Sequence, residues 1–464
     1  MRTLQASTLV TLLLLASLSA VFPHALATDT TIKGETTWSG AVLLTGNVTV
    51  ANGTTLNIKP GTTIDGGDDH WILVKGTLIA NDATFSSSHT PLTQGSHGAG
   101  LWVGLHVSAT GHAVLTNVII NNAKTAVRND GQLTGSDLTI NDAYIGINNA
   151  GTATVANLTA NDIDYDAVRN SGDFTVEEAT ITRVAGGVIS SGTATISDAS
   201  FIQAGSALRA TAGQFDATRI GFDTVTVGIA SQAGASMSVS SLTGTSVALT
   251  VDAGNSDDLT LSNMVIEGHR LMLASGATMV SGHDITFAGN LNETRATIDQ
   301  RCSGACSWSQ TTLTNVVWGL ALSGGGTHTL SNVTAVATER NLDASGTGAV
   351  IATQLNLSGS DAAISLRGPD SDIDGASISL VSANSIGLDV LDGIHEWKNV
   401  ELSKPYSSQD ATSIGVKAWY STIAVQALSI THFATGIDAS DATITGNTIT
   451  VADGKMTGIA LHDS

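Results

Sequence analysis

Three short stretches decide how this chain folds: "VIINNAKTAV" at 118–127, "LTINDAYIGI" at 138–147 and "LTANDIDYDA" at 158–167. Each has alternating apolar residues followed by an asparagine, and successive copies begin twenty residues apart. The repeated asparagines are Asn121, Asn141 and Asn161. A fixed interval of this length predicts a solenoid, in which equivalent residues of successive coils lie above one another.

Glycines that end short polar turns extend the interval along the chain. They lie 20 or 21 residues apart and are Gly111, Gly131, Gly151, Gly172, Gly192, Gly213, Gly234 and Gly254. Apolar residues recur two, seven and nine positions after these glycines, which is the two-residue alternation of strands and not the spacing of a helix. We therefore predict an all-β parallel solenoid with three short strands in each coil of about 20–21 residues.

The repeated asparagines follow the last inward residue of the second strand, where the chain must bend. Asparagine tolerates the left-handed conformation that such a bend needs, and its amide can donate to the same residue of the next coil. We expect Asn121, Asn141 and Asn161 to form such a ladder. A second set lies two residues before the glycines and is either another ladder or a row of solvated turn residues: Asn129, Asn149 and Asn170.

The N-terminal part carries the motifs of a known group. The succession W-S-G at 38–40, G-T-T-L-x-I-x-P-G-T-T-I at 53–64, V-K-G-T-L-x-A at 74–80 and W-x-G-L at 102–105 is similar to secreted microbial β-helix repeat proteins. The whole repeat pattern resembles the right-handed parallel β-helix superfamily, whose fold is pectate-lyase-like and single-stranded. Three tryptophans are expected to seal the N-terminal end of the solenoid, in preference to the alternative of a ligand platform: Trp38, Trp71 and Trp102.

The segment 1–27 has the pattern of a signal peptide. Arg2 precedes an apolar run from Leu9 to about Leu18, and the segment ends in Ala25-Leu26-Ala27, a small-x-small cleavage site. The run is shorter than the ~20 residues that span a bilayer, and no later segment is long and apolar enough. We expect a secreted or cell-surface protein without a membrane span.

The charge of the remaining chain limits its partners. Without the segment 1–27, which contains Arg2, the chain has 18 Lys and Arg against 40 Asp and Glu, a net charge of −22. Nucleic acid and anionic lipid need a positive surface, so neither is an expected partner. The charge suits divalent cations or simply solubility. The two cysteines, Cys302 and Cys306, are too few for a disulfide scaffold, and we expect them to close a small loop.

The chain divides into segments according to how regularly the repeat of 20–21 residues is kept. We predict the signal peptide at 1–27, then an N-terminal cap with the first coils at 28–110 and regular coils at 111–288. A loop insertion with the cysteine pair at 289–310 follows, and further coils occupy 311–464 with an irregular loop at 394–420. The last residues resemble mid-repeat sequence, which allows self-assembly through the C-terminal end as one hypothesis.

Two sets of residues are candidates for binding. Asp370, Asp372 and Asp374 form D-x-D-x-D-G with Gly375, the opening of a calcium loop, although Val381 stands where the final bidentate glutamate would be. The repeat frame places Ile373 inward, so these aspartates are equally consistent with ordinary outward strand residues. A possible aromatic ligand-binding loop, which could instead pack back on the solenoid, contains Trp397, Tyr406, Trp419 and Tyr420.

Function is left open between three hypotheses. The favoured one is a non-catalytic structural, adhesive or glycan-binding role in a secreted or cell-surface protein. The resemblance implies an alternative, a lyase, hydrolase or epimerase acting on an acidic polysaccharide, although no clustered catalytic residues recur along the coils. The third is a subunit of an extracellular filament or surface assembly. Calcium is the one cofactor that the sequence suggests, and the expected partner is polysaccharide or another cell-surface component.

Overall fold

The fold is described from a computed structural model of the chain. The structure describes residues 24–27, 29–88, 102–232, 234–254, 258–274, 279–346, 348–359, 361–406 and 412–462. These residues form strands and turns, divided into a first unit, Met1–Arg169, and a second unit, Asn170–Ser464. Among them, none forms a helix with the length and apolar character needed to cross a membrane.

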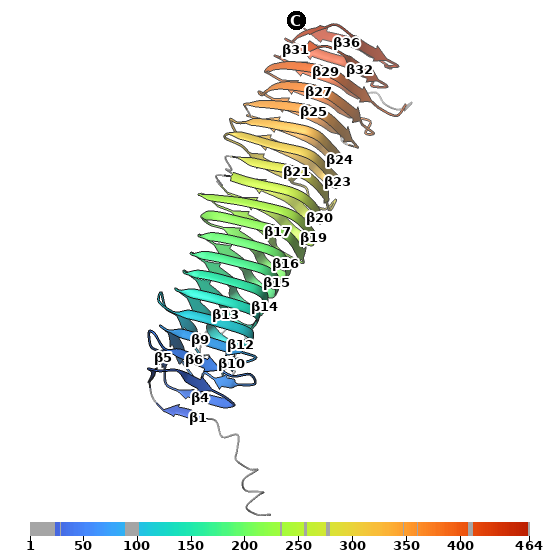
Figure 1. Ribbon diagram of the computed structural model, residues 1–464. Helices are drawn as coiled ribbons and strands as arrows, with labels where there is room; N and C mark the ends of the chain where they lie inside the picture. Colours follow the sequence, from blue (N-terminus) through green and yellow to red (C-terminus); the bar gives the residue numbers. More distant parts are fainter. Residues whose placement is uncertain are drawn as a thin grey trace, which may run out of the picture. The chain divides into compact units, whose positions relative to one another are not determined.

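Parallel strands stacked coil upon coil build the first unit (Figure 1). Its strands are β1 (His24–Ala27), β2 (Thr30–Ile32), β3 (Thr36–Trp38), β4 (Ala41–Thr45), β5 (Val48–Val50), β6 (Thr55–Ile58), β7 (Thr63–Asp65), β8 (Trp71–Val74), β9 (Thr77–Asn81), β10 (Thr84–Ser86), β11 (Gly104–Val107), β12 (His112–Asn129), β13 (Gln132–Asn149) and β14 (Thr152–Asn170), whose last residue belongs to the second unit. Strand β4 pairs with β7, β5 with β8 and β6 with β9, so the pairing advances by three strands per coil here. In β12, β13 and β14 one unbroken stretch of strand covers most of a coil.

The second unit continues the same parallel stacking within itself. Its strands are β15 (Asp173–Ser190), β16 (Thr193–Ala210), β17 (Gly213–Asp223), β18 (Val227–Ser231), β19 (Ala235–Ala253), β20 (Asp258–Ala274), β21 (Val280–Ala288), β22 (Ala296–Arg301), β23 (Ala305–Ser323), β24 (Thr327–Ser345), β25 (Ala349–Ser358), β26 (Ala362–Arg367), β27 (Asp370–Ser379), β28 (Ile386–Leu391), β29 (Ile394–Ser403), β30 (Ile414–Trp419), β31 (Thr422–Val425), β32 (Leu428–Thr431), β33 (Thr435–Ser440), β34 (Thr443–Gly446), β35 (Ile449–Ala452) and β36 (Thr457–His462). Both units are therefore parallel β-solenoids of the right-handed type, and the predicted fold class is confirmed.

Apolar side chains fill each unit in vertical columns. Residues two, seven and nine positions after the glycines pair with their counterparts of the next coil, as in Ala113↔Leu133, Val118↔Leu138 and Ile120↔Ile140. These side chains are almost completely buried. Because a coil of about 20 residues has too little apolar surface to fold alone, the stacking of coils about 4.8 Å apart is what buries the core.

The predicted asparagine ladder is present in the first unit. Asn141 donates its side-chain amide to the Oδ1 of Asn121 at 2.9 Å, and Asn161 donates to Asn141 at 3.0 Å. Of the two reasons given for asparagine at this position, amide donation along the stack is confirmed and the left-handed bend is wrong. The left-handed conformation belongs to the following residue, as in Asn122 (φ 53°) and Asp142 (φ 52°), because the ladder asparagine still lies in the paired strand.

The second row of asparagines is buried and not solvated. Asn129 is fully buried and donates to the Oδ1 of Asn149 at 2.7 Å and to the carbonyl of Thr152 at 3.0 Å, while its own Oδ1 accepts from the Gly131 amide. In the second unit Asn170 makes the equivalent contacts with Ser190 and with the Thr193 carbonyl. These side chains satisfy backbone groups that the turn leaves unpaired.

Two predicted irregular segments are largely strand. In 289–310, β22 and the start of β23 continue the coils, and only 289–295 and the short turn at 302–304 lie outside strands. In 394–420, β29 pairs with β27 and β30 pairs with β28. The alternation of apolar residues is interrupted in both segments because polar residues occupy inward positions. Gln300 and His395 are examples, and both are fully buried. Residues 407–411 lie outside the described residues.

Outward positions of the second unit fall into chemically different columns. One column near the start of the coil is rich in hydroxyls that bond along the stack, including Thr218 to Ser240 and Thr353 to Ser331, both at 3.2 Å. Another column, on the strands that close the coil, carries an aspartate at every second coil. It contains Asp252, Asp299, Asp343, Asp389 and Asp438. Skipping one coil separates neighbouring carboxylates by about 9.6 Å, which limits their repulsion.

The last described coil leaves apolar residues exposed. Ile459 and Leu461 continue the inward columns of Ile437 and Ala439, and their side chains are 52% and 60% exposed. Self-assembly through this part of the chain stays a prediction.

We predict that replacing Asn141 with alanine lowers the free energy of unfolding by about 1–3 kcal/mol, since two side-chain hydrogen bonds of the ladder are lost at roughly 0.5–1.5 kcal/mol each. Denaturant titration followed by circular dichroism measures the change. Asn157→Ala is the matched control, because it removes one exposed hydrogen bond, to Asp137, and leaves the ladder intact. An equal loss of stability in the two variants would contradict a special role for the ladder.

Candidate functional site

The predicted calcium ligands do not converge. Asp370, Asp372 and Asp374 are exposed and alternate with the buried Ser371 and Ile373 along β27, as ordinary outward strand residues do. Each carboxylate also has its own neighbour: Asp370 accepts from the Ile394 amide at 2.8 Å, Asp374 accepts from Asn399 at 3.0 Å, and Asp372 lies 3.9 Å from the Lys398 ammonium. The calcium-loop geometry is therefore not formed by these three residues.

No other acidic run gathers into a metal site in the part of the chain that the structure describes. Among those residues, no three histidine, cysteine, aspartate or glutamate side chains lie together in a way that could hold a metal ion. Two aspartates of the first unit contact cations instead, Asp69 with Lys124 and Asp166 with Arg169.

The predicted aromatic loop separates into a buried and an exposed part. Trp397 is only 1% exposed and points into the coil, so its assignment to a surface ligand site is wrong. It pairs in register with Ile373 and donates its indole N–H to the Ser371 hydroxyl at 3.3 Å. His395 lies 2.9 Å from that hydroxyl through Nδ1 and 2.8 Å from the Asp392 carbonyl through Nε2, which completes the hydrogen bonding of this buried cluster.

The other three aromatics of that set are on the surface. Tyr406, Trp419 and Tyr420 are 71%, 43% and 61% exposed. Lys417 lies over the Trp419 ring, and Tyr406 packs edge-on to His432 with Lys455 over its ring. They remain available to a ligand, but no pocket among those described combines them.

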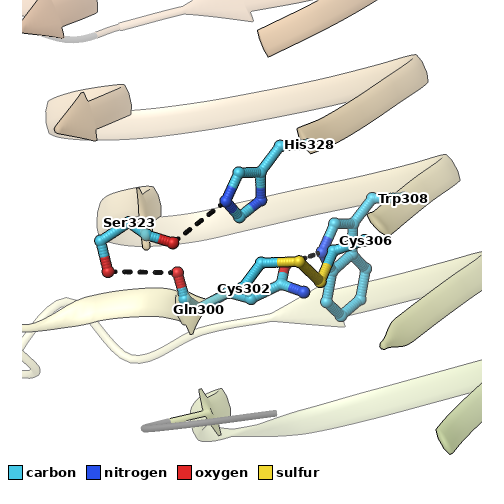
Figure 2. The surroundings of a disulfide bond; sticks show 6 residues. All are labelled: Gln300, Cys302, Cys306, Trp308, Ser323 and His328. Atoms are coloured by element: carbon cyan, nitrogen blue, oxygen red, sulfur yellow. Dashed lines mark hydrogen bonds between the residues drawn. A yellow bond between two sulfur atoms is a disulfide. The ribbon is translucent and has the colours of Figure 1, made fainter. Parts of the chain in front are cut away.

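The predicted disulfide is confirmed. Cys302 and Cys306 are bonded to each other and almost fully buried. Figure 2 shows the pair beside Trp308, whose indole N–H donates to Gln300 at 2.6 Å. His328 lies nearby and contacts the Ser323 carbonyl at 3.2 Å. The disulfide closes the turn between β22 and β23, and it is buried away from solvent.

The three tryptophans expected at the N-terminal end have different surroundings. Trp38 is buried at the end of β3. Trp102 is fully buried, stacks on Phe85 at 6.0 Å and donates to the Asn121 carbonyl at 3.0 Å. Trp71 is 36% exposed and lies at the start of β8. A sealing role stays a prediction, and Trp71 presents part of its ring to solvent.

A pocket of about 350 Å³ lies beside this exposed ring in the first unit. Three outward residues of consecutive coils share one register position in its wall: His106 pairs with Arg128, and Arg128 pairs with Asn148. The remaining wall is formed by Trp71, Val103, Gly104, Leu105 and Thr125.

A glycine lines the hollow beside the indole. Gly104 is the residue that pairs with Trp71 in the next coil, so no side chain stands beside the indole there. Its φ is 117°, and a Cβ at this position would lie 1.7 Å from the Thr125 carbonyl oxygen. Only glycine fits, because any side chain would collide with the backbone of the following coil.

One carboxylate neutralises the cationic wall of the pocket. Asp130 lies 2.8 Å from His106 Nε2 and 3.2 Å from an Arg128 guanidinium nitrogen. Partial burial opposes ionisation of this carboxyl, but the hydrogen bonds from His106 and Arg128 outweigh it and hold the pKa of Asp130 below its usual value. The cluster is therefore a fixed ion pair with hydrogen-bond donors facing the pocket.

Aromatic surface continues on the neighbouring coils of the first unit. Tyr144 precedes Ile145, which pairs with Thr125 of the pocket wall. Its ring stacks on Tyr165 at 5.6 Å, and the Arg169 guanidinium lies 4.7 Å from the centre of the Tyr165 ring.

The sequence signal for this site was weak because the coil that carries His106 has a longer turn. Val107 pairs with Asn129. Val107 lies four residues before Gly111, whereas Asn129 lies two residues before Gly131. Counting back from the glycines therefore misaligns His106 with Arg128. The sequence shows that arginine recurs at positions 128 and 169. It does not show that Asp130 pairs with Arg128 and His106. Trp71 and Gly104 are distant in the sequence, so only the pairing of β8 with β11 brings them together.

Comparison with known proteins found no matching family model, no matching curated protein and no matching solved structure.

We predict that the second unit loses stability as the pH falls below about 6.5. Burial lowers the pKa of both His328 and His395 below the ordinary value of 6.5. Below that pH the unfolded chain binds protons at these positions and the folded chain does not, so the free energy of unfolding decreases. Comparing melting temperatures at pH 7.5 and 5.5 tests this, since most carboxylates keep their charge over that interval.

His395→Asn should make the melting temperature depend less on pH over this range. The exposed His269→Asn is the control and should leave the dependence as in the natural chain. A dependence unchanged in His395→Asn would contradict the assignment to buried histidine.

Proposed function

We propose that this protein is an exported, non-catalytic β-solenoid that binds glycans through the Trp71 pocket of its first unit. The observation that carries the proposal is an exposed indole ring beside three hydrogen-bonding side chains, in a hollow of about 350 Å³. Small-molecule sites usually combine an apolar wall with a few placed polar groups in a volume of about this size.

Sugar rings suit this combination of groups. Their C–H faces are apolar and pack on an aromatic ring, while their hydroxyls both donate and accept hydrogen bonds. Trp71 supplies the ring, Arg128 supplies donors, and Asn148 supplies one donor group and one acceptor. The stacked pair Tyr144 and Tyr165 offers further aromatic surface one and more coils away, which suits a ligand of several residues.

Export and surface attachment belong to the same proposal. The signal-peptide pattern of the segment 1–27 supports export from the cytoplasm to surroundings where polysaccharides are abundant. A structural or adhesive role on a cell surface would follow if the bound glycan belonged to a wall or matrix. The parallel stacking within each unit supports such a role because each coil is held by its neighbours.

An enzyme acting on polysaccharide is the alternative. A hydrolase needs one carboxyl group that is protonated and another that is free. Asp130, the carboxylate nearest to the Arg128 wall of the pocket, is held ionised between His106 and Arg128, which favours binding over acid catalysis.

We predict that Trp71→Ala weakens glycan binding by about tenfold or more, because an aromatic contact buried by a ligand is worth roughly 1–3 kcal/mol. Binding of the purified protein to a panel of polysaccharides, measured by affinity electrophoresis and calorimetry, tests this. The exposed Trp419→Ala in the second unit is the matched control and should bind as the natural chain does.

Loss of binding in Trp419→Ala but not in Trp71→Ala would move the site to the second unit. Release of reducing or unsaturated sugar from the same panel would replace the binding role with the enzymatic alternative.

A further inference from the structure

We infer that Asp130 sets the ligand class of the Trp71 pocket, so that the site takes uncharged glycans and excludes uronate or sulfated ones. The inference rests on the proposed glycan-binding function and names the residue that determines its specificity. It comes from how three described cations on this surface, Arg128, Lys124 and Arg169, are paired with carboxylates.

Asp130 makes contacts with Arg128 that an anionic ligand group could otherwise make. Its Oδ2 lies 2.8 Å from His106 Nε2 and 3.2 Å from an Arg128 Nη atom, and its Oδ1 accepts from Arg128 Nε at 3.4 Å. One edge of the guanidinium, made by Nε and one Nη atom, is thus directed at a carboxylate that the chain itself provides. This edge is one of the two forks with which an arginine can recognise a carboxylate or sulfate.

The three side chains of this cluster are open to solvent, and two of them, His106 and Arg128, line the pocket. The Arg128 side chain is 55% exposed, and those of His106 and Asp130 are 31% and 27% exposed. The guanidinium nitrogen and hydrogen atoms not used by Asp130 can still donate to sugar hydroxyls. The cluster therefore offers neutral hydrogen bonding without net positive charge.

The other cations of this surface are compensated in the same way. Lys124, next to Thr125 of the pocket wall, contacts Asp69. Arg169, over the Tyr165 ring, contacts Asp166 at 2.9 Å. An anionic glycan lying across the pocket would meet each cation together with its carboxylate, and the chain as a whole carries a net charge of −21. Repulsion by these carboxylates disfavours charged sugars.

Asp130→Asn tests the assignment. The amide keeps the shape and one acceptor but removes the charge, so Arg128 becomes an uncompensated cation beside the indole. We expect binding of a uronate polysaccharide to increase at least about tenfold and to weaken with added salt. Binding of uncharged polysaccharide should stay within about threefold of the natural chain.

Asp137→Asn is the matched control. Asp137 is an exposed aspartate of the same unit with φ 54°, a conformation that asparagine tolerates, and it contacts Asn157 and not the pocket. It should leave both kinds of binding unchanged. Melting temperatures of the two variants show whether each is folded, and Asp130→Ser provides a second removal of the charge.

Three outcomes would overturn the inference: a natural chain that prefers uronate to uncharged polysaccharide, folded Asp130 variants without increased anion binding, or the same increase in Asp137→Asn. Failure of the proposed function is a separate result, in which no polysaccharide binds the natural chain. In that case binding of free glucuronate to Asp130→Asn still decides whether Asp130 controls charge preference: a salt-sensitive gain supports it, and no gain overturns it.

Discussion

Vertical register between coils is the constraint on which the rest of this structure depends. In the pairings of β12 with β13, β15 with β16 and β16 with β17, paired residues lie a constant 20 or 21 positions apart in the sequence. Inward apolar side chains therefore lie over equivalent side chains of the next coil. No single coil could bury its own core, and the free energy of folding is gained only when neighbours share a face. The turns, ladders and outer surface all follow from keeping that register.

At each ladder turn, two adjacent residues have different roles in keeping the register. A left-handed residue makes the bend, and the residue before it stays in the strand, where its side chain can bond along the stack. That is why the ladder position holds asparagine in Asn121, Asn141 and Asn161, while the bend tolerates other residues later in the chain, including Arg183 and Gln203. Buried asparagines two residues before the glycines satisfy backbone groups at another turn.

A filled interior leaves function to the outer surface, where register also arranges side chains. His106, Arg128 and Asn148 come from three coils and become neighbours because their positions coincide. Gly104, which pairs with Trp71, lines the pocket beside them without a side chain of its own. Asp130 then decides the charge of that surface, which links local ion pairing to the class of ligand proposed.

The sequence by itself determined the fold class, the spacing of coils, the Asn121 ladder and the Cys302–Cys306 disulfide, since all of these are repeated or local patterns. It could not decide which way an isolated aromatic or polar side chain points. Trp397 and His395 lie inward because Ser371 of the preceding coil completes their hydrogen bonding, and that partner is 24 or more residues away. Only the tertiary structure brings Trp71 to Gly104 and His106 to Asp130. The turns between strands differ in length, so a residue's distance from the repeated glycine does not give its position on the coil.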